Sequence, residues 1–341
     1  MPARLQWTRL TDEELLKLRM RNLHLRVEGR PLERRIRHLY RELKARGIRF
    51  KPHVWLSDEF FTPDGVSGIA IPFYLAHPRL MKLERRQMLE LEGGTEKECM
   101  RILRHEAGHA LDNAYRLHVK PSWRKMFGAV SKPYPQTYKP NPASREYVLH
   151  LDCWYAQAHP LEDYAETFAV WLRLGSRWHK RYREWPALQK LEYIDHLMNE
   201  IKGKPAINRV RTKVDPLSEL KITLGEHYRR KKERYSLEYP DFYDRDLLRI
   251  FSRDHRRTWR PTAVSFLRSL RSELCTIVAE GTGVHTYTID HVLNNIMERA
   301  KELKLRMASS EPQTKRETMI MLTVHTMNIV HSGRYRFRYG L

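Results

Sequence analysis

The sequence is poor in cysteine and lacks long apolar runs, and both shortages exclude classes of protein. Its three cysteines, Cys99, Cys153 and Cys275, are odd in number and widely spaced, so they provide neither a disulfide framework nor a four-cysteine metal site. We expect each to be a small buried hydrophobic residue in a protein of the reducing cytoplasm. The longest apolar run, residues 318–330, is shorter than the roughly 18 residues that a membrane-spanning helix needs.

The first residues, MPARLQWTRL, also lack the unbroken apolar core of a secretory signal, because charged side chains interrupt them from Arg4 onward. We therefore expect no export by the general pathway and no membrane span. A content of 41% hydrophobic and 30% charged residues is typical of a folded globular protein rather than a disordered one.

Positive charge is abundant, with 63 Lys and Arg against 41 Asp and Glu and a net charge of +22. Residues 203–341 carry half of this excess, so the charge is spread over both parts of the chain. The sequence contains neither a single basic arm nor a motif that reads nucleic-acid bases. Such a field attracts an acidic partner or nucleic acid without specifying which.

The chain is long enough for two domains, and Gly203 to Pro205 provide a break between them. We predict one domain over residues 1–202 and a basic helical domain of unknown role over residues 203–341. The second domain has helical patterns at residues 217–232, 245–252, 262–280, 288–307 and 315–330. Residues 334–339 alternate basic and aromatic side chains, which fits an edge strand or a partner-binding tail.

One short stretch, residues 104–111, has the spacing of a metal site. His105 and His109 are four residues apart, and Glu106 directly follows the first histidine. On a helix both imidazoles share one face, where they can hold Zn²⁺ while Glu106 faces the water at the open position. This is the H-E-x-x-H pattern of zinc-dependent hydrolases. Gly108 lowers helix propensity there by about 1 kcal/mol, which indicates a packing or functional reason for it.

The surroundings of the motif predict a helix over residues 95–117. Thr95 and Glu98 have the spacing of a capping box, and apolar residues then recur at steps of three and four. A second capping box, Thr11 with Glu14, predicts an earlier helix near the start of the chain.

A third ligand is expected on a later helix that begins at Pro160. Glu162 and Glu166 are one turn apart on one face of it, and a nearby cation would relieve their repulsion. We predict Glu162 as the third zinc ligand and Glu166 as the carboxylate that orients a ligand histidine. The alternative is a solvated acidic helix start, which the helix dipole favours in any case. His159 is either a substrate contact or a neighbour of the helix cap.

Between the first helices and the motif, the pattern changes to short extended segments. Residues 66–75 form a strand-like run that contains Pro72, and proline is confined to edge strands because it donates no ladder hydrogen bond. Within this run, residues 69–75 either pair with a substrate backbone or form an ordinary edge strand. The proline-rich stretch at residues 133–142 predicts a shaped loop that forms one wall of a cleft.

Four stretches carry a resemblance to a known family: IPFYLAHP at 71–78, HEAGHA at 105–110, WYAQ at 154–157 and HPLEDYAETF at 159–168. Together they resemble a bacterial family of zinc-binding metallopeptidases of the gluzincin type. They are more distantly similar to the catalytic domain of lethal-factor-like metalloproteases. The resemblance spans roughly residues 30–200 and implies a zincin-like domain.

The resemblance also implies roles for individual residues. Tyr155 would be the hydroxyl that stabilises the oxyanion, and Glu106 would be the general base. The implied zinc ligands are His105, His109 and Glu162, with Glu166 behind them.

We therefore predict a mostly helical α+β protein, in which a zincin-like metallopeptidase domain precedes an all-α region. Its predicted function is hydrolysis of peptide bonds in a peptide or protein substrate by a zinc-activated water. The alternative is a basic protein that binds nucleic acid or another partner and whose zinc site is structural or inactive. An open fourth position on the metal would distinguish the enzyme from a closed structural site.

Overall fold

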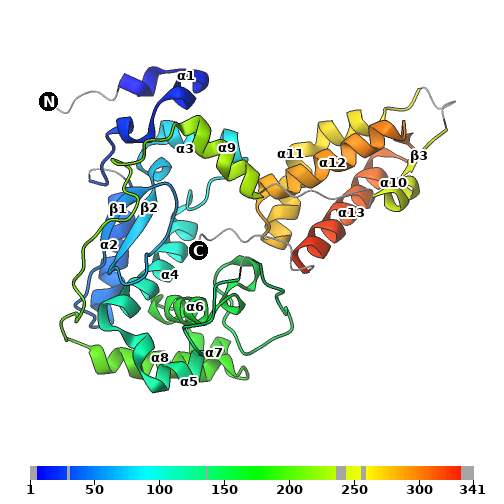
Figure 1. Ribbon diagram of the computed structural model, residues 1–341. Helices are drawn as coiled ribbons and strands as arrows, with labels where there is room; N and C mark the ends of the chain where they lie inside the picture. Colours follow the sequence, from blue (N-terminus) through cyan, green and yellow to red (C-terminus); the bar gives the residue numbers. More distant parts are fainter. Residues whose placement is uncertain (1–5, 29–30, 136, 236–242, 255–258, 332–341) are drawn as a thin grey trace. The chain divides into compact units, whose positions relative to one another are not determined.

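A computed structural model describes residues 6–28, 31–135, 137–235, 243–254 and 259–331 (Figure 1). The expected mostly helical α+β class is confirmed, because long helices accompany two small sheets. The chain divides into two compact units: unit 1 holds Met1–Gln87, Leu91–Arg230 and Phe337–Leu341, and unit 2 holds Met88–Glu90 and Lys231–Arg336. Residues 203–230 thus group with unit 1, beyond the break that Gly203 to Pro205 indicated.

Unit 1 contains most of the helices and one parallel sheet. Its helices are α1 (Asp12–Lys17), α2 (Pro31–Ala45), α3 (Pro78–Met88), α4 (Glu96–Tyr115), α5 (Pro121–Phe127), α6 (Pro160–Leu172), α7 (Trp178–Arg181), α8 (Ala187–Ile201) and the start of α9 (Leu224–Tyr235). Its strands are β1 (His53–Ser57) and β2 (Gly68–Pro72). Five short 3₁₀ helices join them: η1 (Gln6–Arg9), η2 (Met20–Leu23), η3 (Phe73–Ala76), η4 (Leu117–Val119) and η5 (Asp152–Gln157).

The capping residues begin their helices where the sequence indicated. Thr11 accepts a hydrogen bond from the backbone N–H of Glu14, whose carboxylate accepts one from the backbone of Thr11 in return. Thr95 caps α4 by accepting from the backbone N–H of Glu98. Each cap satisfies donors that the first helical turn leaves unpaired, so short-range chemistry fixes where α4 begins.

In the sheet of unit 1, the edge of β2 is less accessible than the sequence predicted. β1 and β2 pair in parallel from His53 with Gly68 to Ser57 with Pro72, and all five residues of β2 are buried. On the outer side of β2, the Ala70 N–H donates to the Phe61 carbonyl at 2.8 Å. The strand expected over residues 66–75 runs only from Gly68 to Pro72, and the chain then turns into η3. The edge proposed for substrate pairing is therefore occupied at Ala70.

Helices α4 and α6 pack closely, with β2 and α2 against α4 and with α8 against α6 (Figure 1). Gly108 allows this approach, because a Cβ at this position would lie 3.0 Å from the Cα of Ala165. The packing reason that the glycine indicated is thus a helix crossing. It brings the side chains of the two motif helices within reach of each other.

Unit 2 is almost entirely helical. It contains α10 (Asp244–Ile250), α11 (Ala263–Thr282), α12 (Thr286–Glu302) and α13 (Glu311–His331), together with the end of α9. Two strands of two residues, β3 (Phe251–Ser252) and β4 (Arg306–Met307), form an antiparallel pair, so the expectation of an all-α region is wrong by this short ribbon. The alternating residues 334–339 lie outside the described residues. Among the described helices, none is both long and apolar enough to span a membrane.

Candidate metal centre

The centre begins with the two histidines of α4. His105 and His109 lie one turn apart, and their Nε2 atoms point toward each other at 3.1 Å. His105 is buried and His109 is half-buried. A helix places residues four apart on the same face, so this convergence follows directly from the spacing in the sequence.

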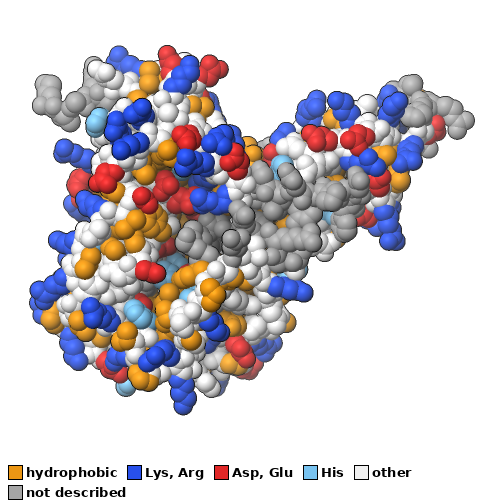
Figure 2. Space-filling model, in the orientation of Figure 1, with side chains coloured by type: hydrophobic (Ala, Val, Ile, Leu, Met, Phe, Trp, Pro, Cys, Tyr) orange, Lys and Arg blue, Asp and Glu red, His pale blue; other side chains and the backbone are white. Residues whose placement is uncertain are grey.

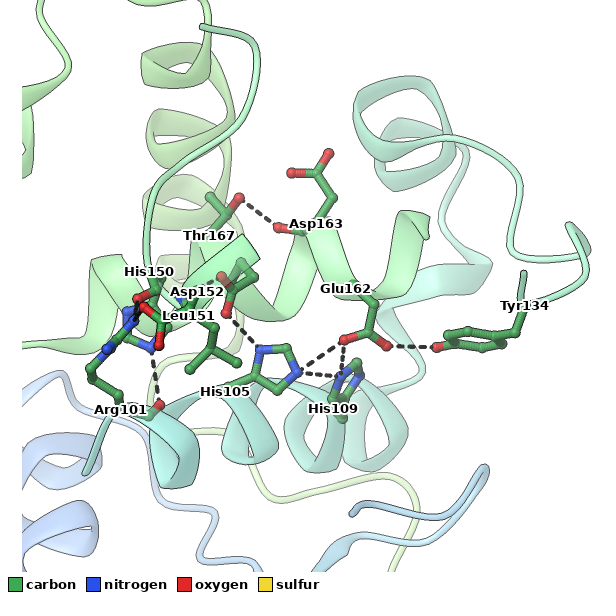
Figure 3. A network of polar contacts seen from close by, with 11 residues as sticks. Arg101, His105, His109, Tyr134, His150, Leu151, Asp152, Glu162, Asp163 and Thr167 are labelled. Carbon is green, nitrogen blue, oxygen red and sulfur yellow. Dashed lines mark hydrogen bonds and ion pairs between the residues drawn. The ribbon is translucent and has the colours of Figure 1, made fainter. Parts of the chain in front are cut away.

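Helix α6 supplies the third ligand atom (Figure 3). Glu162 Oε2 lies 3.0 Å from His105 Nε2 and 3.3 Å from His109 Nε2. Ligand atoms placed at about 2.0–2.1 Å from a tetrahedral zinc are separated from one another by roughly 3.3 Å. The triangle therefore has the dimensions of three corners of a zinc site, and these three residues form a group that could hold a metal ion.

Glu166 fixes the orientation of the first histidine. Its Oε1 accepts a hydrogen bond from His105 Nδ1 at 2.9 Å, and its Oε2 accepts one from the Leu151 N–H at 2.7 Å. Because Glu166 holds a proton on Nδ1, Nε2 is the nitrogen of His105 that faces the centre and would give its lone pair to a metal ion. Carboxylates in this position behind a ligand histidine are a recurring feature of zinc sites. The fully buried Glu166 also ties the chain at Leu151 to α6.

The electrostatics of the centre favour a positive charge. Burial opposes the charged form of His105, but hydrogen bonds to Glu162 and Glu166 raise its pKa to about 10. Burial likewise opposes charge on Glu162, yet the two histidines hold its pKa well below the ordinary value. The site thus retains protons on nitrogen next to an ionised carboxylate. A metal cation that displaced those protons would be stabilised by the same negative electrostatic potential.

Glu106 lies beside the ligands on the same helix. It is buried, and burial raises its pKa although His105 and His109 pull it down. A hydrogen bond from the side chain of Thr62 also lowers this pKa. Thr62 therefore lies beside Glu106, and an acid of raised pKa is suited to take up and release a proton.

Tyr155 directly follows a turn whose backbone is strained. Its ring centroid is 5.6 Å from that of His105 and the residue is buried. The two preceding residues, Cys153 and Trp154, both have positive φ, at 57° and 54°. Non-glycine residues in this region are held there only when their surroundings dictate it, and such strain concentrates at functional sites. Tyr138 contributes by donating its hydroxyl hydrogen to the Cys153 carbonyl at 2.8 Å.

Tyr134 is the residue of this centre that sequence reasoning missed. Its hydroxyl donates to Glu162 Oε1 at 3.0 Å (Figure 3). Its ring stacks on that of His159 with centroids 3.9 Å apart. The expectation of a cleft wall at residues 133–142 pointed to this loop, but no periodicity selects one tyrosine in it.

His159 itself is the cap of α6 rather than an exposed substrate contact. Its Nδ1 accepts from the Leu161 N–H, and its Nε2 donates to the Lys132 carbonyl at 2.9 Å. Both ring nitrogens are engaged and the side chain is buried. The ring therefore serves as a fixed platform under Tyr134.

The cysteines take no part in the centre. Cys99, Cys153 and Cys275 are buried, and none of the three forms a disulfide. Burial raises the pKa of Cys99 to about 11 and that of the other two to about 12. Such thiols are poor nucleophiles and poor ligands at neutral pH.

Comparison with known proteins agrees with this geometry. Residues 82–198 match a family model described as "Putative zinc-binding metallo-peptidase". The match contains both motif helices and the turn that carries Tyr155. No curated protein and no solved structure matches the chain. The segment that holds the candidate metal centre is therefore similar to this family, described as zinc-binding metallopeptidases.

Proposed function

We propose that the protein hydrolyses peptide bonds with a zinc ion held by His105, His109 and Glu162. One observation carries the proposal: the three ligand atoms form a buried triangle with edges of 3.0 to 3.3 Å. Two nitrogen ligands and one carboxylate leave a fourth position open, as in catalytic zinc sites. The proposed site is thus of the gluzincin type, in which a glutamate from a second helix completes H-E-x-x-H.

The residues around the triangle supply the remaining chemistry. A bound zinc ion would lower the pKa of its water toward about 7 and polarise the scissile carbonyl. Glu106 Oε takes the proton from the water and later transfers it to the leaving amine. The Tyr155 hydroxyl donates a hydrogen bond to the developing oxyanion. In this proposal Glu166 and Tyr134 act only through the ligands His105 and Glu162.

The alternative of a structural zinc site is less well supported. Structural sites close the metal with four Cys or His ligands, whereas the described residues of this centre offer two histidines and one glutamate. A buried glutamate beside the ligands also has no use in a structural site. We keep the cytoplasm as the proposed location, since three buried thiols fit a reducing compartment.

Zinc content is the first test. We would purify the wild type and single variants without added metal and count zinc per chain by elemental analysis. The proposal expects one zinc in the wild type, loss in His109→Ala and Glu162→Ala, and weakened binding in Glu166→Gln. His196→Ala, which changes an exposed histidine paired with Glu200, is the matched control and should retain zinc.

The results can contradict the proposal in two ways. A wild type that takes up no zinc after reconstitution would overturn the proposal that the protein is a zinc enzyme. Retention of zinc in Glu162→Ala with loss in Glu166→Gln would exchange the roles of the two carboxylates. Cleavage of a quenched fluorescent peptide library, with and without a chelator, then tests whether the loaded protein is a peptidase.

A further inference from the structure

An extended stretch of unit 1, residues 203–217, runs past β1 from α8 toward α9 (Figure 1). The indole N–H of Trp55 donates to the Val214 carbonyl at 2.9 Å, and the Leu217 N–H donates to the Leu56 carbonyl at 2.8 Å. The stretch is therefore fixed against the strand by specific hydrogen bonds. Its exposed side chains keep defined positions next to β1.

Two hollows open between this stretch and the strand. The first, of about 410 Å³, is lined by residues 49–51, 53, 205–206 and 208–211 together with Ser67. It contains four cationic side chains and no acidic one: Arg49, Lys51, Arg209 and Arg211. The second, of about 810 Å³, shares Arg211 with the first and adds Arg21, Arg26 and Lys213, against the acids Glu28 and Glu219.

Six of the seven cations that line the hollows are exposed, and Arg21 is half-buried. Among the described residues, none of the seven makes an ion pair within 4.0 Å of a carboxylate. Arg49 and Arg209 instead donate to the backbone carbonyls of Gly203 and Ala206, each at 3.3 Å. These bonds direct the guanidinium groups without neutralising them.

The cations also converge on one place. Lys51 Nζ lies 5.8 Å from the centroid of the Tyr40 ring. Burial raises the pKa of Tyr40, and the charge of Arg211 partly opposes this rise. Lys51, which precedes β1, and Arg211, on the crossing stretch, both line the first hollow. Cations that line one hollow without a carboxylate among them favour the binding of an anion.

The pattern favours an anion that repeats along a chain. Arg209 and Arg211 face the first hollow, while Arg211 and Lys213 face the second, so every other residue presents a cation. A nucleic-acid backbone supplies one phosphate at every step. Phe50 and Val210 line the first hollow as well, and apolar surface beside a basic groove suits unpaired bases.

We propose that these two hollows form a groove that binds single-stranded nucleic acid through its phosphates. The groove uses other residues than the metal centre and does not depend on peptidase activity. The net charge of +22 would attract any polyanion, and Figure 2 shows Lys and Arg side chains scattered over the visible face. The test must therefore separate the groove from this general field.

The experiment compares two variants of equal charge in the full-length protein. The groove variant combines Arg49→Gln, Lys51→Gln, Arg209→Gln and Arg211→Gln. The control combines four exposed cations outside the hollows: Arg34→Gln, Arg173→Gln, Lys180→Gln and Arg183→Gln. Binding of a fluorescein-labelled oligothymidylate is measured by anisotropy over a range of salt concentrations, with a duplex of equal length and a polyglutamate peptide as competitors.

The groove variant should bind at least ~10-fold more weakly than wild type in low salt, because up to four phosphate contacts are lost. The slope of log K against log salt should flatten by up to about 2.8, at roughly 0.7 for each lost contact with a single strand. The control should keep most of the wild-type affinity. Equal losses in the two variants, or stronger competition by duplex or polyglutamate than by the unlabelled single strand, would overturn the proposal. Unchanged zinc content in both variants shows that the metal centre is intact.

Discussion

Unit 1 contains two charged regions that are built in opposite ways. In the metal centre the charged groups are buried and contact one another, as when Glu166 joins His105 to the chain at Leu151. In the groove beside β1, cations such as Arg211 are exposed and make no ion pair among the described residues. A buried charge depends on its partner, because leaving it unpaired is costly. An exposed one is stabilised by water, so its loss affects binding more than folding.

The largest effect should come from the buried centre. Glu106→Gln removes the proposed base and should lower kcat/KM by about 10²–10⁴-fold, while zinc content stays at the wild-type level. Peptide cleavage and elemental analysis on the same preparation check both halves of this prediction. Glu96→Gln, an exposed position in the first turn of α4, is the matched control and should leave both unchanged. Loss of zinc in Glu106→Gln would instead make this residue a ligand.

A buried ion pair next to the centre offers a direct comparison with the groove. Arg104 and Glu42 make two hydrogen bonds, at 2.8 and 2.9 Å, between α4 and α2. Glu42→Ala leaves the guanidinium buried and unpaired, so it should lower the free energy of unfolding by about 3–5 kcal/mol. Arg211→Gln in the groove should change it by less than about 0.5 kcal/mol. Denaturant unfolding of both variants measures the difference.

The double change Arg104→Met with Glu42→Leu sharpens this prediction. It removes both charges and keeps the volume, so it should recover much of the stability that Glu42→Ala loses. If Glu42→Ala proves no more destabilising than Arg211→Gln, burial is not what separates the two regions.

A smaller effect is expected from Tyr134, which supports a ligand without being one. Tyr134→Phe keeps the ring on His159 but removes the hydrogen bond to Glu162, so zinc affinity should fall by roughly 10- to 100-fold. Tyr138→Phe removes another hydroxyl of the same loop, but this hydroxyl donates to the Cys153 carbonyl and not to a ligand. It should leave zinc affinity unchanged and reduce kcat through Tyr155. Competition with a chelator measures the affinity, and equal losses in the two variants would assign Tyr134 a general role in loop folding.

Much of the centre could be predicted because its spacing is local. Residues four apart on a helix share a face, so His105 with His109 and Glu162 with Glu166 could each be paired from the sequence. The caps at Thr11 and Thr95 are equally local. Which two helices pack together depends on tertiary contacts, which local spacing does not reveal. Only Gly108 indicated in the sequence that another element approaches closely.

The rest depends on contacts between distant segments. Nothing in residues 69–75 reveals that Phe61 pairs with Ala70 and occupies the strand edge. The strand stops at Pro72 because Phe73–Ala76 are buried in a 3₁₀ turn, which their apolar character alone cannot distinguish from a strand. Likewise, residues 203–217 look like a linker in composition, yet β1 fixes them through side-chain donors such as Trp55.

The smallest predicted effect concerns an ion pair that is intermediate between the two regions. His118, whose side chain is 30% exposed, lies 2.6 Å from the buried Asp112. The hydrogen bond to Asp112 raises the pKa of His118 above its ordinary value. A group whose pKa is higher in the folded state stabilises the fold below its unfolded pKa of about 6.5 and loses that contribution as pH rises through the folded value.

His118→Gln should therefore reduce the free energy of unfolding at acidic pH, by less than about 1 kcal/mol because the pair is partly solvated. The difference from wild type should shrink as pH rises above the folded pKa of His118. Urea unfolding of both proteins between pH 5.5 and 9 measures this trend, and titration of the metal centre cancels because both proteins share it. His196→Gln, which changes an exposed histidine paired with Glu200, is the control for the loss of a surface imidazole. If the difference in the free energy of unfolding between the two proteins widens toward alkaline pH, Asp112 stabilises the neutral imidazole. The contact would then be a neutral hydrogen bond and not an ion pair.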